Sequence, residues 1–224
     1  MKKGVVLAAG LVLLLAACAK KEPETIKIGA IFSMTGASFL GVPEARTAEM
    51  VAEQINSSGG VLGRKIEVII KDSGASPEKA LSFAKQLIEE NKVFAIIGPS
   101  TSGESMQIKD LCEQSQTLLI SAAAAETIVN PVAKWVFKSP QKDSYAVHWI
   151  YGTMKDLGIK RIAALSSNTG FGQGGMAFLE KYAAEYGLQI ASREVYDRAA
   201  TDLTAVLTKV KSANVEAVVN WSIE

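Results

Sequence analysis

Three segments rich in Ser, Thr, Ala and Gly carry the polar groups best suited to binding: residues 33–41, 98–103 and 121–125. The second reads Gly-Pro-Ser-Thr-Ser-Gly and leads into a predicted helix. A helix start offers unpaired backbone N–H groups and the positive end of the helix dipole, which suit a carboxylate or a similar anion. Ser and Thr also act as plain N-caps. Three such segments at one sheet edge favour the binding interpretation.

Residues that could perform catalysis are sparse. The only His, His148, lies in an apolar helix pattern, and no G-x-S-x-G nucleophile motif occurs. Residues 170–175 match G-x-G-x-x-G, and Glu194 follows at about the distance of a dinucleotide-binding acid. Four residues, 166–169, separate the predicted strand from the first Gly, whereas that motif needs a tight turn at the strand end. An exported dinucleotide-binding enzyme therefore remains only an alternative.

The composition excludes several classes of protein. Lys and Arg number 24 against 23 Asp and Glu, so no basic surface for nucleic acid is expected. Two Cys cannot build a disulfide framework, and one His makes a zinc site unexpected. We therefore predict no cofactor, no metal and no nucleic-acid partner.

The first residues have the pattern of an export signal. Lys2 and Lys3 precede an apolar run, residues 5–15, that is too short to span a bilayer. Leu15-Ala16-Ala17-Cys18 resembles the lipobox of bacterial lipoproteins, in which the Cys is lipidated and the leader is removed. We expect residues 1–17 to be a lipoprotein signal peptide and 18–25 a lipid-anchored tether, and the mature protein to be extracytoplasmic, with Cys18 as its only membrane contact.

Strand and helix patterns alternate along the remaining chain. This alternation predicts an α/β protein with parallel sheets and right-handed crossovers. The irregular stretch around residues 124–143 divides it into an N-terminal lobe, 26–140, and a C-terminal lobe, 141–224. The second lobe would hold three strands, so it is expected to be incomplete and the sequence a fragment. Predicted strands are 26–32, 65–71, 93–97, 118–120, 135–138, 161–165, 190–195 and 217–221, and predicted helices include 43–56, 76–91, 144–157, 174–186 and 202–211.

Several motifs together resemble one family. They are Ile-Gly-Ala-Ile-Phe-Ser-Met-Thr-Gly at 28–36, Gly-Gly-Val-Leu-Gly-Arg at 59–64, Ile-Gly-Pro-Ser-Thr-Ser at 97–102 and Gly-Phe-Gly-Gln-Gly at 170–174. With the lipobox leader, the chain resembles the leucine/isoleucine/valine-binding solute receptors of ABC importers. The resemblance implies the type I periplasmic binding protein fold, with two Rossmann-like lobes that close on a ligand about a hinge near residues 139–143.

The resemblance also implies a set of ligand-binding residues. Ser102 matches the hydroxyl that holds the ligand carboxylate, and Ala123 matches a main-chain contact. At Ala125 the family usually has Thr, and at Phe171 it usually has Tyr. An aromatic residue near the first loop is replaced by Leu40. The expected ligand-binding residues are Ser102, Ser100, Thr101, Ala123, Ala125, Leu40 and Phe171.

These departures share one direction, because hydroxyl groups are lost and apolar surface is gained. An apolar carboxylate without an ammonium group is therefore expected to fit better than a free amino acid, although a branched-chain or other apolar amino acid stays a candidate. The implied partners are ABC permease and ATPase subunits. A ligand sensor of the same fold, acting on a signalling partner, is the second interpretation.

Overall fold

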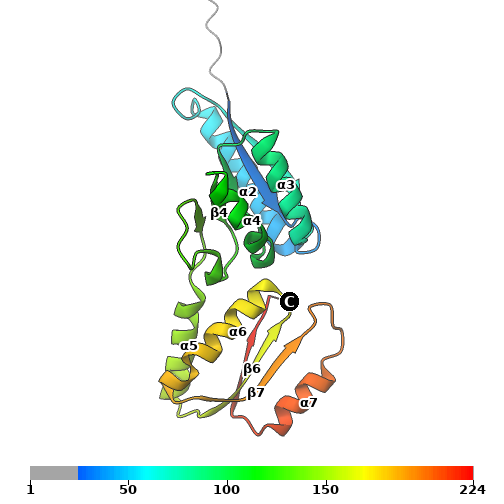
Figure 1. The fold of residues 1–224 in the computed structure, drawn as a ribbon, viewed down its shortest axis with the longest axis vertical. Coiled ribbons are helices and arrows are strands. Elements are labelled where there is room, and N and C mark those ends of the chain that lie inside the picture. The colour runs from blue at the N-terminus through cyan, green and yellow to red at the C-terminus, as the bar shows by residue number, and fades with distance from the viewer. Residues whose placement is uncertain (1–24, 224) are drawn as a thin grey trace, which may run out of the picture.

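The computed structural model describes residues 25–223 and shows two α/β lobes stacked along the long axis of the molecule (Figure 1). The predicted signal peptide, Cys18 and all but the last residue of the predicted tether lie outside the described residues. The first lobe has a five-stranded sheet of order β2-β1-β3-β4-β5, and the second has a three-stranded sheet of order β7-β6-β8. All recorded strand pairs within the two sheets are parallel, as the alternating pattern predicted.

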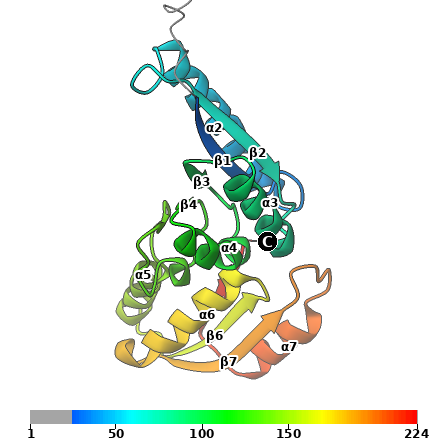
Figure 2. The same ribbon diagram turned by 45° about the horizontal axis from the view of Figure 1, so that its top comes forward.

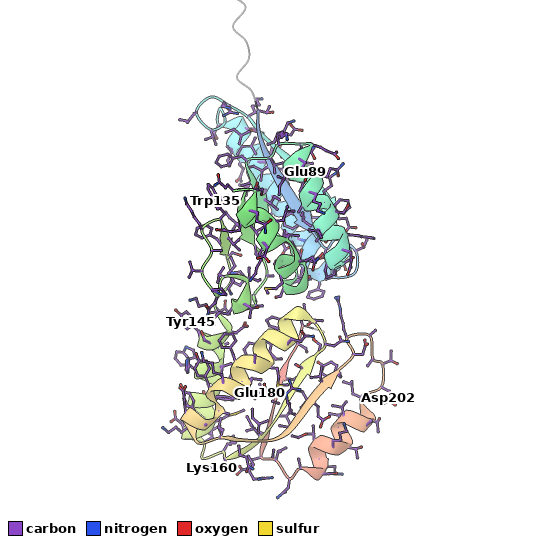
Figure 3. The ribbon with its side chains drawn as sticks, viewed as in Figure 1. Glu89, Trp135, Tyr145, Lys160, Glu180 and Asp202 are labelled. Carbon is purple, nitrogen blue, oxygen red and sulfur yellow. The ribbon has the colours of Figure 1, made fainter. Side chains whose placement is uncertain are left out.

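The elements follow the predicted order closely. The first lobe contains β1 (Ile26–Phe32), α2 (Ser38–Ser57), β2 (Ile66–Asp72), α3 (Pro77–Glu89), β3 (Ala95–Ile97), α4 (Ser102–Gln114), β4 (Leu118–Ser121), a 3-10 turn η1 (Glu126–Ile128) and β5 (Val136–Lys138). The second contains α5 (Asp143–Asp156), β6 (Arg161–Ser167), α6 (Gly170–Tyr182), η2 (Ala183–Tyr186), β7 (Gln189–Tyr196), α7 (Thr204–Ser212) and β8 (Ala217–Trp221). Figure 3 labels Glu89 and Trp135 on the first lobe, and Lys160 and Asp202 on the second lobe.

The first lobe is held by an apolar core between its sheet and helices α3 and α4. Ile31, Ile96 and Leu119 come from adjacent strands and are completely buried in this core. Burying each such side chain contributes about 1.5–3 kcal/mol. Cys112 of α4 lies in the same core, and its burial raises the pKa of the thiol to about 12.

The second lobe packs α5 and α6 on its sheet through aromatic residues. Tyr151 is completely buried and its hydroxyl donates to the Leu179 carbonyl at 2.9 Å. Gly175 lies against the Trp221 ring, where a Cβ would come within 2.1 Å of a ring carbon. A side chain at position 175 would therefore displace Trp221 from the core. His148 belongs to this lobe, with its Nδ1 2.9 Å from the Tyr186 hydroxyl.

Two helices begin earlier than the sequence predicted. Helix α2 starts at Ser38 instead of near Pro43, so part of the expected loop 33–41 is helical. Gly41 allows this start, because a Cβ there would lie 2.3 Å from the Ser33 carbonyl carbon. Helix α6 starts at Gly170, because the Thr169 hydroxyl accepts from the Gly172 N–H and caps the helix.

The connection between the lobes is braced by polar side chains on either side of residues 139–142. The Asp143 carboxylate accepts from the Glu126 N–H at 2.7 Å, and the Glu126 carboxylate accepts from the Ser144 N–H at 3.0 Å. Lys138 Nζ donates to the carbonyls of Ala124 at 2.6 Å and Gln141 at 2.7 Å. Asp143 of the second lobe thus accepts from the start of η1 in the first lobe, and Glu126 of the first lobe accepts from the start of α5 in the second lobe.

Candidate ligand-binding site

A cavity of about 300 Å³ lies between the two lobes at the carboxyl ends of their strands. This is where ligands bind in open α/β sheets. In Figure 2, α4 of the first lobe and α6 of the second meet at this level, close to the end of the chain. The lining residues are Leu40, Ala75, Pro77, Ser100, Thr101, Ser102, Gly103, Ala122, Ala123, Ala124, Asn168, Thr169, Gly170, Phe171, Arg198 and Ile223.

The start of α4 provides the main polar group of the cavity. Ser102 is the first residue of this helix and is 3% exposed. Its Oγ accepts a hydrogen bond from the Ala125 N–H at 3.2 Å, which fixes the hydroxyl and leaves its proton to donate. Together with the N–H groups of the first helical turn, this hydroxyl forms an arrangement that can bind an anion.

Ser100 and Thr101 are held from behind by two glutamates. The Ser100 hydroxyl accepts from the Ser33 N–H at 3.0 Å and donates to Glu44 Oε2, so both of its roles are used inside the protein. The completely buried Glu104 accepts from the Thr101 N–H at 3.2 Å and from the Ser33 hydroxyl at 2.8 Å. These contacts position the 100–103 loop against the first lobe.

The environment of Glu44 changes its titration. Burial raises the pKa of its carboxyl above the ordinary value of 4.5, and the nearby Glu104 raises it further. The hydrogen bond from Ser100 acts in the opposite direction but does not cancel the rise. The fold therefore disfavours the charged form of the Glu44 carboxyl.

The second lobe brings another helix start to the same cavity. Thr169 caps α6, whose first residue, Gly170, packs directly on Gly103 of α4. A Cβ on Gly170 would lie 2.8 Å from the Gly103 nitrogen, so only a residue without a side chain allows this approach. Two helix N-termini therefore converge on the cavity, and their dipoles add a positive potential there.

The structure brings most of the predicted ligand-binding residues together. Ser100, Thr101, Ser102, Ala123, Leu40 and Phe171 all line the cavity, but Ala125 does not. Ala125 is completely buried, and only its N–H takes part, as the donor to Ser102. Leu40 and Phe171 are apolar, and the Phe171 ring also packs 5.9 Å from the Trp221 ring.

Apart from Phe171, which the family resemblance supplied, sequence reasoning missed the contribution of the second lobe to the cavity. Asn168, Arg198 and Ile223 line the cavity and follow β6, β7 and β8 respectively. The rule that located the first-lobe loops, polar or small residues after a strand end, would also have located Asn168. Arg198 gave no such signal, because an Arg in a polar loop is typical of solvent-exposed surface.

Within residues 25–223, no three His, Cys, Asp or Glu side chains gather as a metal-ion site requires. None of the helices within these described residues is both long and apolar enough to cross a bilayer.

Comparison with known proteins identifies the family. Residues 25–224 match the model of a family described as periplasmic binding protein. The chain belongs to the periplasmic binding protein family. It is 28% identical over 201 residues to the leucine-, isoleucine-, valine-, threonine- and alanine-binding protein of Pseudomonas aeruginosa, covering 87% of this chain and 53% of that protein.

Solved periplasmic binding proteins share the fold. The substrate-binding protein of a Streptococcus pneumoniae branched-chain amino acid transporter, in complex with isoleucine, is 28% identical with a TM-score of 0.76, covering 88% of this chain and 56% of that one. A solute-binding protein of a Rhodopseudomonas palustris ABC transporter, in complex with 3,4-dihydroxybenzoic acid, is 25% identical with a TM-score of 0.74, covering 88% and 54%. This periplasmic binding protein sequence therefore spans about half the length of the relatives it matches.

In this periplasmic binding protein, the glycines of the G-x-G-x-x-G match have packing roles. Gly170 meets Gly103, and Gly175 meets Trp221. At Gly172 a Cβ would lie 2.1 Å from the Ser167 carbonyl oxygen. Close packing of α6 therefore accounts for these glycines without a dinucleotide.

Proposed function

We propose that the protein is an extracytoplasmic solute-binding lipoprotein of an ABC importer, which binds a small apolar carboxylate between its lobes. The observation that carries the proposal is the cavity at the strand ends, with Ser102 and the start of α4 in its wall. One similar solved structure holds isoleucine and another holds 3,4-dihydroxybenzoic acid. Both ligands have a carboxylate group, which supports this ligand class.

The chemistry of the cavity wall supports an acid without an ammonium group. Among the described lining residues no side chain is acidic, so a ligand ammonium has no carboxylate partner there. Leu40, Ala75, Pro77 and Phe171 offer an apolar surface to the body of the ligand. Ligand pockets are commonly apolar with a few polar groups that fix orientation.

Binding in this proposal works by closure of the lobes. The ligand carboxylate accepts from the Ser102 hydroxyl and the first N–H groups of α4, and the approach of α6 at Gly170 removes it from water. Because the ligand contacts both lobes only in the closed form, ligand binding shifts the equilibrium between the open and closed forms toward the closed form. The permease then recognises this closed form. Residues 139–142, with the Asp143 and Glu126 caps beside them, are the proposed hinge.

The location and partners follow from the leader and the family. We propose that lipidated Cys18 anchors the protein to the outer face of a membrane and that ABC permease and ATPase subunits receive the ligand. Several acyl chains together give stable anchoring, since each buried methylene contributes about 0.8 kcal/mol.

The test is calorimetry on the purified protein with leucine, isoleucine, benzoate and 3,4-dihydroxybenzoate. We expect an acid without an ammonium group to bind, and Ser102→Ala to weaken it by about 10–100-fold, because a hydrogen bond to a charged group is lost. Ser100→Ala is the contrasting variant, since its hydroxyl is engaged by Ser33 and Glu44. It should lower the melting temperature with little change in affinity. Unchanged affinity in Ser102→Ala would place the ligand elsewhere.

A further inference from the structure

A second recess lies at the opposite end of the first lobe from the ligand cavity. It has a volume of about 760 Å³ and is lined from residues 25–28, 61–66 and 90–94, which lead into or begin β1, β2 and β3. In Figure 1 the blue start of β1 lies beside the cyan loop that follows α2, at the end of the molecule farthest from the second lobe. We call this surface the amino-end face, because it is formed at the amino ends of the strands.

A tight turn projects an apolar side chain from the amino-end face. The Val61 N–H donates to the Arg64 carbonyl at 2.8 Å and the Arg64 N–H to the Val61 carbonyl at 3.0 Å, so only Leu62 and Gly63 form the turn. Their φ angles are +52° and +75°, the pattern of a type I′ turn, in which Asn-Gly is the favoured pair. A bulky residue at positive φ is uncommon. Turn geometry therefore does not account for the leucine at position 62.

Burial does not account for this leucine either. Leu62 is 97% exposed, and Phe94, which lines the same recess, is 70% exposed. The Phe94 N–H donates to the Lys27 carbonyl of β1 at 2.8 Å, so its backbone is fixed beside the first strand. Two large apolar side chains thus lie in water at one end of the lobe, which is typical of a surface that contacts a partner or a membrane.

Basic side chains accompany this apolar surface. Lys27 and Lys92 line the recess, and the exposed Lys65 follows the turn. Glu90 is the only acidic residue among the described residues that line the recess. Apolar side chains flanked by lysines suit the boundary between lipid headgroups and acyl chains, where anionic lipids attract the positive charge.

The start of the described chain lies in this same face. Thr25 lines the recess, the Ile26 N–H donates to the Lys65 carbonyl at 2.8 Å, and Arg64 Nη2 donates to the Thr25 carbonyl at 3.3 Å. Cys18 precedes Thr25 by seven residues, which span at most about 25 Å. A lipid on Cys18 would therefore keep the amino-end face close to the bilayer. A short tether gives an effective concentration in the millimolar range, so a weak contact is sufficient for docking.

We propose that the amino-end face docks on an anionic membrane surface, with Leu62 and Phe94 in the headgroup region and the three lysines near lipid phosphates. This inference rests on the proposed function, in which Cys18 is lipidated. The ligand cavity lies at the carboxyl ends of the strands, so a docked protein keeps it away from the lipid and open to solute.

The experiment uses the lipidated protein on vesicles of phosphatidylcholine, with or without phosphatidylglycerol. Ser58→Cys, in the loop before the turn, carries an NBD fluorophore, and Cys112 does not compete because burial raises the pKa of its thiol to about 12. On vesicles with phosphatidylglycerol we expect doxyl-labelled lipid to quench the fluorophore and dithionite, which reduces water-exposed label, to react slowly. Salt at about 1 M should weaken both effects by screening the lysines.

Leu62→Asn tests the contact without endangering the fold. Asn is favoured at this turn position, so the melting temperature should stay equal or rise while quenching by lipid and protection from dithionite are lost. Leu157→Asn is the matched control, because Leu157 is 72% exposed at the end of α5 in the second lobe and should leave both signals unchanged.

The remaining outcomes separate this inference from the proposed function. Equal quenching in Leu62→Asn and in the protein with Leu62 would overturn the inference. So would a fluorophore protected from dithionite but not quenched by lipid, because a second copy or residues 18–24 would then cover the face. A protein that stays anchored with its label fully exposed would overturn docking alone. A protein that the vesicles do not retain would overturn docking together with the proposed lipid anchor.

Discussion

Replacing Gly170 by Ala tests whether the two lobes meet as the structure places them. A Cβ at this position would lie 2.8 Å from the Gly103 nitrogen and 2.9 Å from its Cα, whereas ordinary contacts begin at 3.4 Å. The starts of α4 and α6 must then separate by roughly 0.6 Å. Overpacking of this kind costs about 1–3 kcal/mol in the closed form, which corresponds to about a 5–150-fold loss of ligand affinity.

The open form should respond in the opposite way. Gly170 is the first residue of α6, and Ala at a compatible helical position stabilises a protein by about 0.4–1 kcal/mol. We therefore expect Gly170→Ala to keep or raise the melting temperature without ligand while weakening binding in calorimetry. Gly152→Ala is the control, because Gly152 lies in α5 away from the cavity and its Cβ would meet only Tyr186 at 4.0 Å. Equal ligand affinity in Gly170→Ala and wild type would refute the closed contact.

Two further variants test the electrostatics behind the site. Because burial raises the pKa of Glu44, its contribution to stability is greatest at low pH and is lost as the pH rises through the folded value. Glu44→Gln should therefore gain stability relative to wild type between pH 4 and pH 7 in urea unfolding, and a constant difference would contradict this. Lys138→Met removes the donor to the Ala124 and Gln141 carbonyls and should lower the free energy of unfolding by about 2–4 kcal/mol. Exposed Lys85→Met should change it little, and equal losses would argue against the brace.

The strands were predictable because their patterns are local. Residues 26–32 and 217–221 are strands with the predicted bounds, and Ser76 caps α3 as its sequence indicated. The helix starts were less predictable, because they depend on tertiary contacts. Ser38 can begin α2 only because Gly41 lets the helix approach the Ser33 backbone. Residue types alone do not reveal such an approach.

Most first-lobe residues of the candidate site were predictable, whereas in the second lobe only Phe171 was predicted, from the family resemblance. Ser102 begins the helix that follows an apolar strand, and both the strand pattern and the helix-start pattern are local. Arg198 reaches the cavity only because the lobes fold together and bring Gly36 next to it. Glu44 reaches Ser100 across 56 positions, which no local pattern encodes. Long-range placement therefore decided which polar groups surround the cavity.

The central claim is that the Ser102 hydroxyl and the start of α4 hold the carboxylate of a small acid between the lobes. A crystal structure of the protein with the acid that calorimetry selects tests it most directly. We predict one carboxylate oxygen within about 3 Å of Ser102 Oγ and of a backbone nitrogen in the first turn of α4. A ligand bound outside the cavity, or inside it with its carboxylate turned away from Ser102, would contradict the claim.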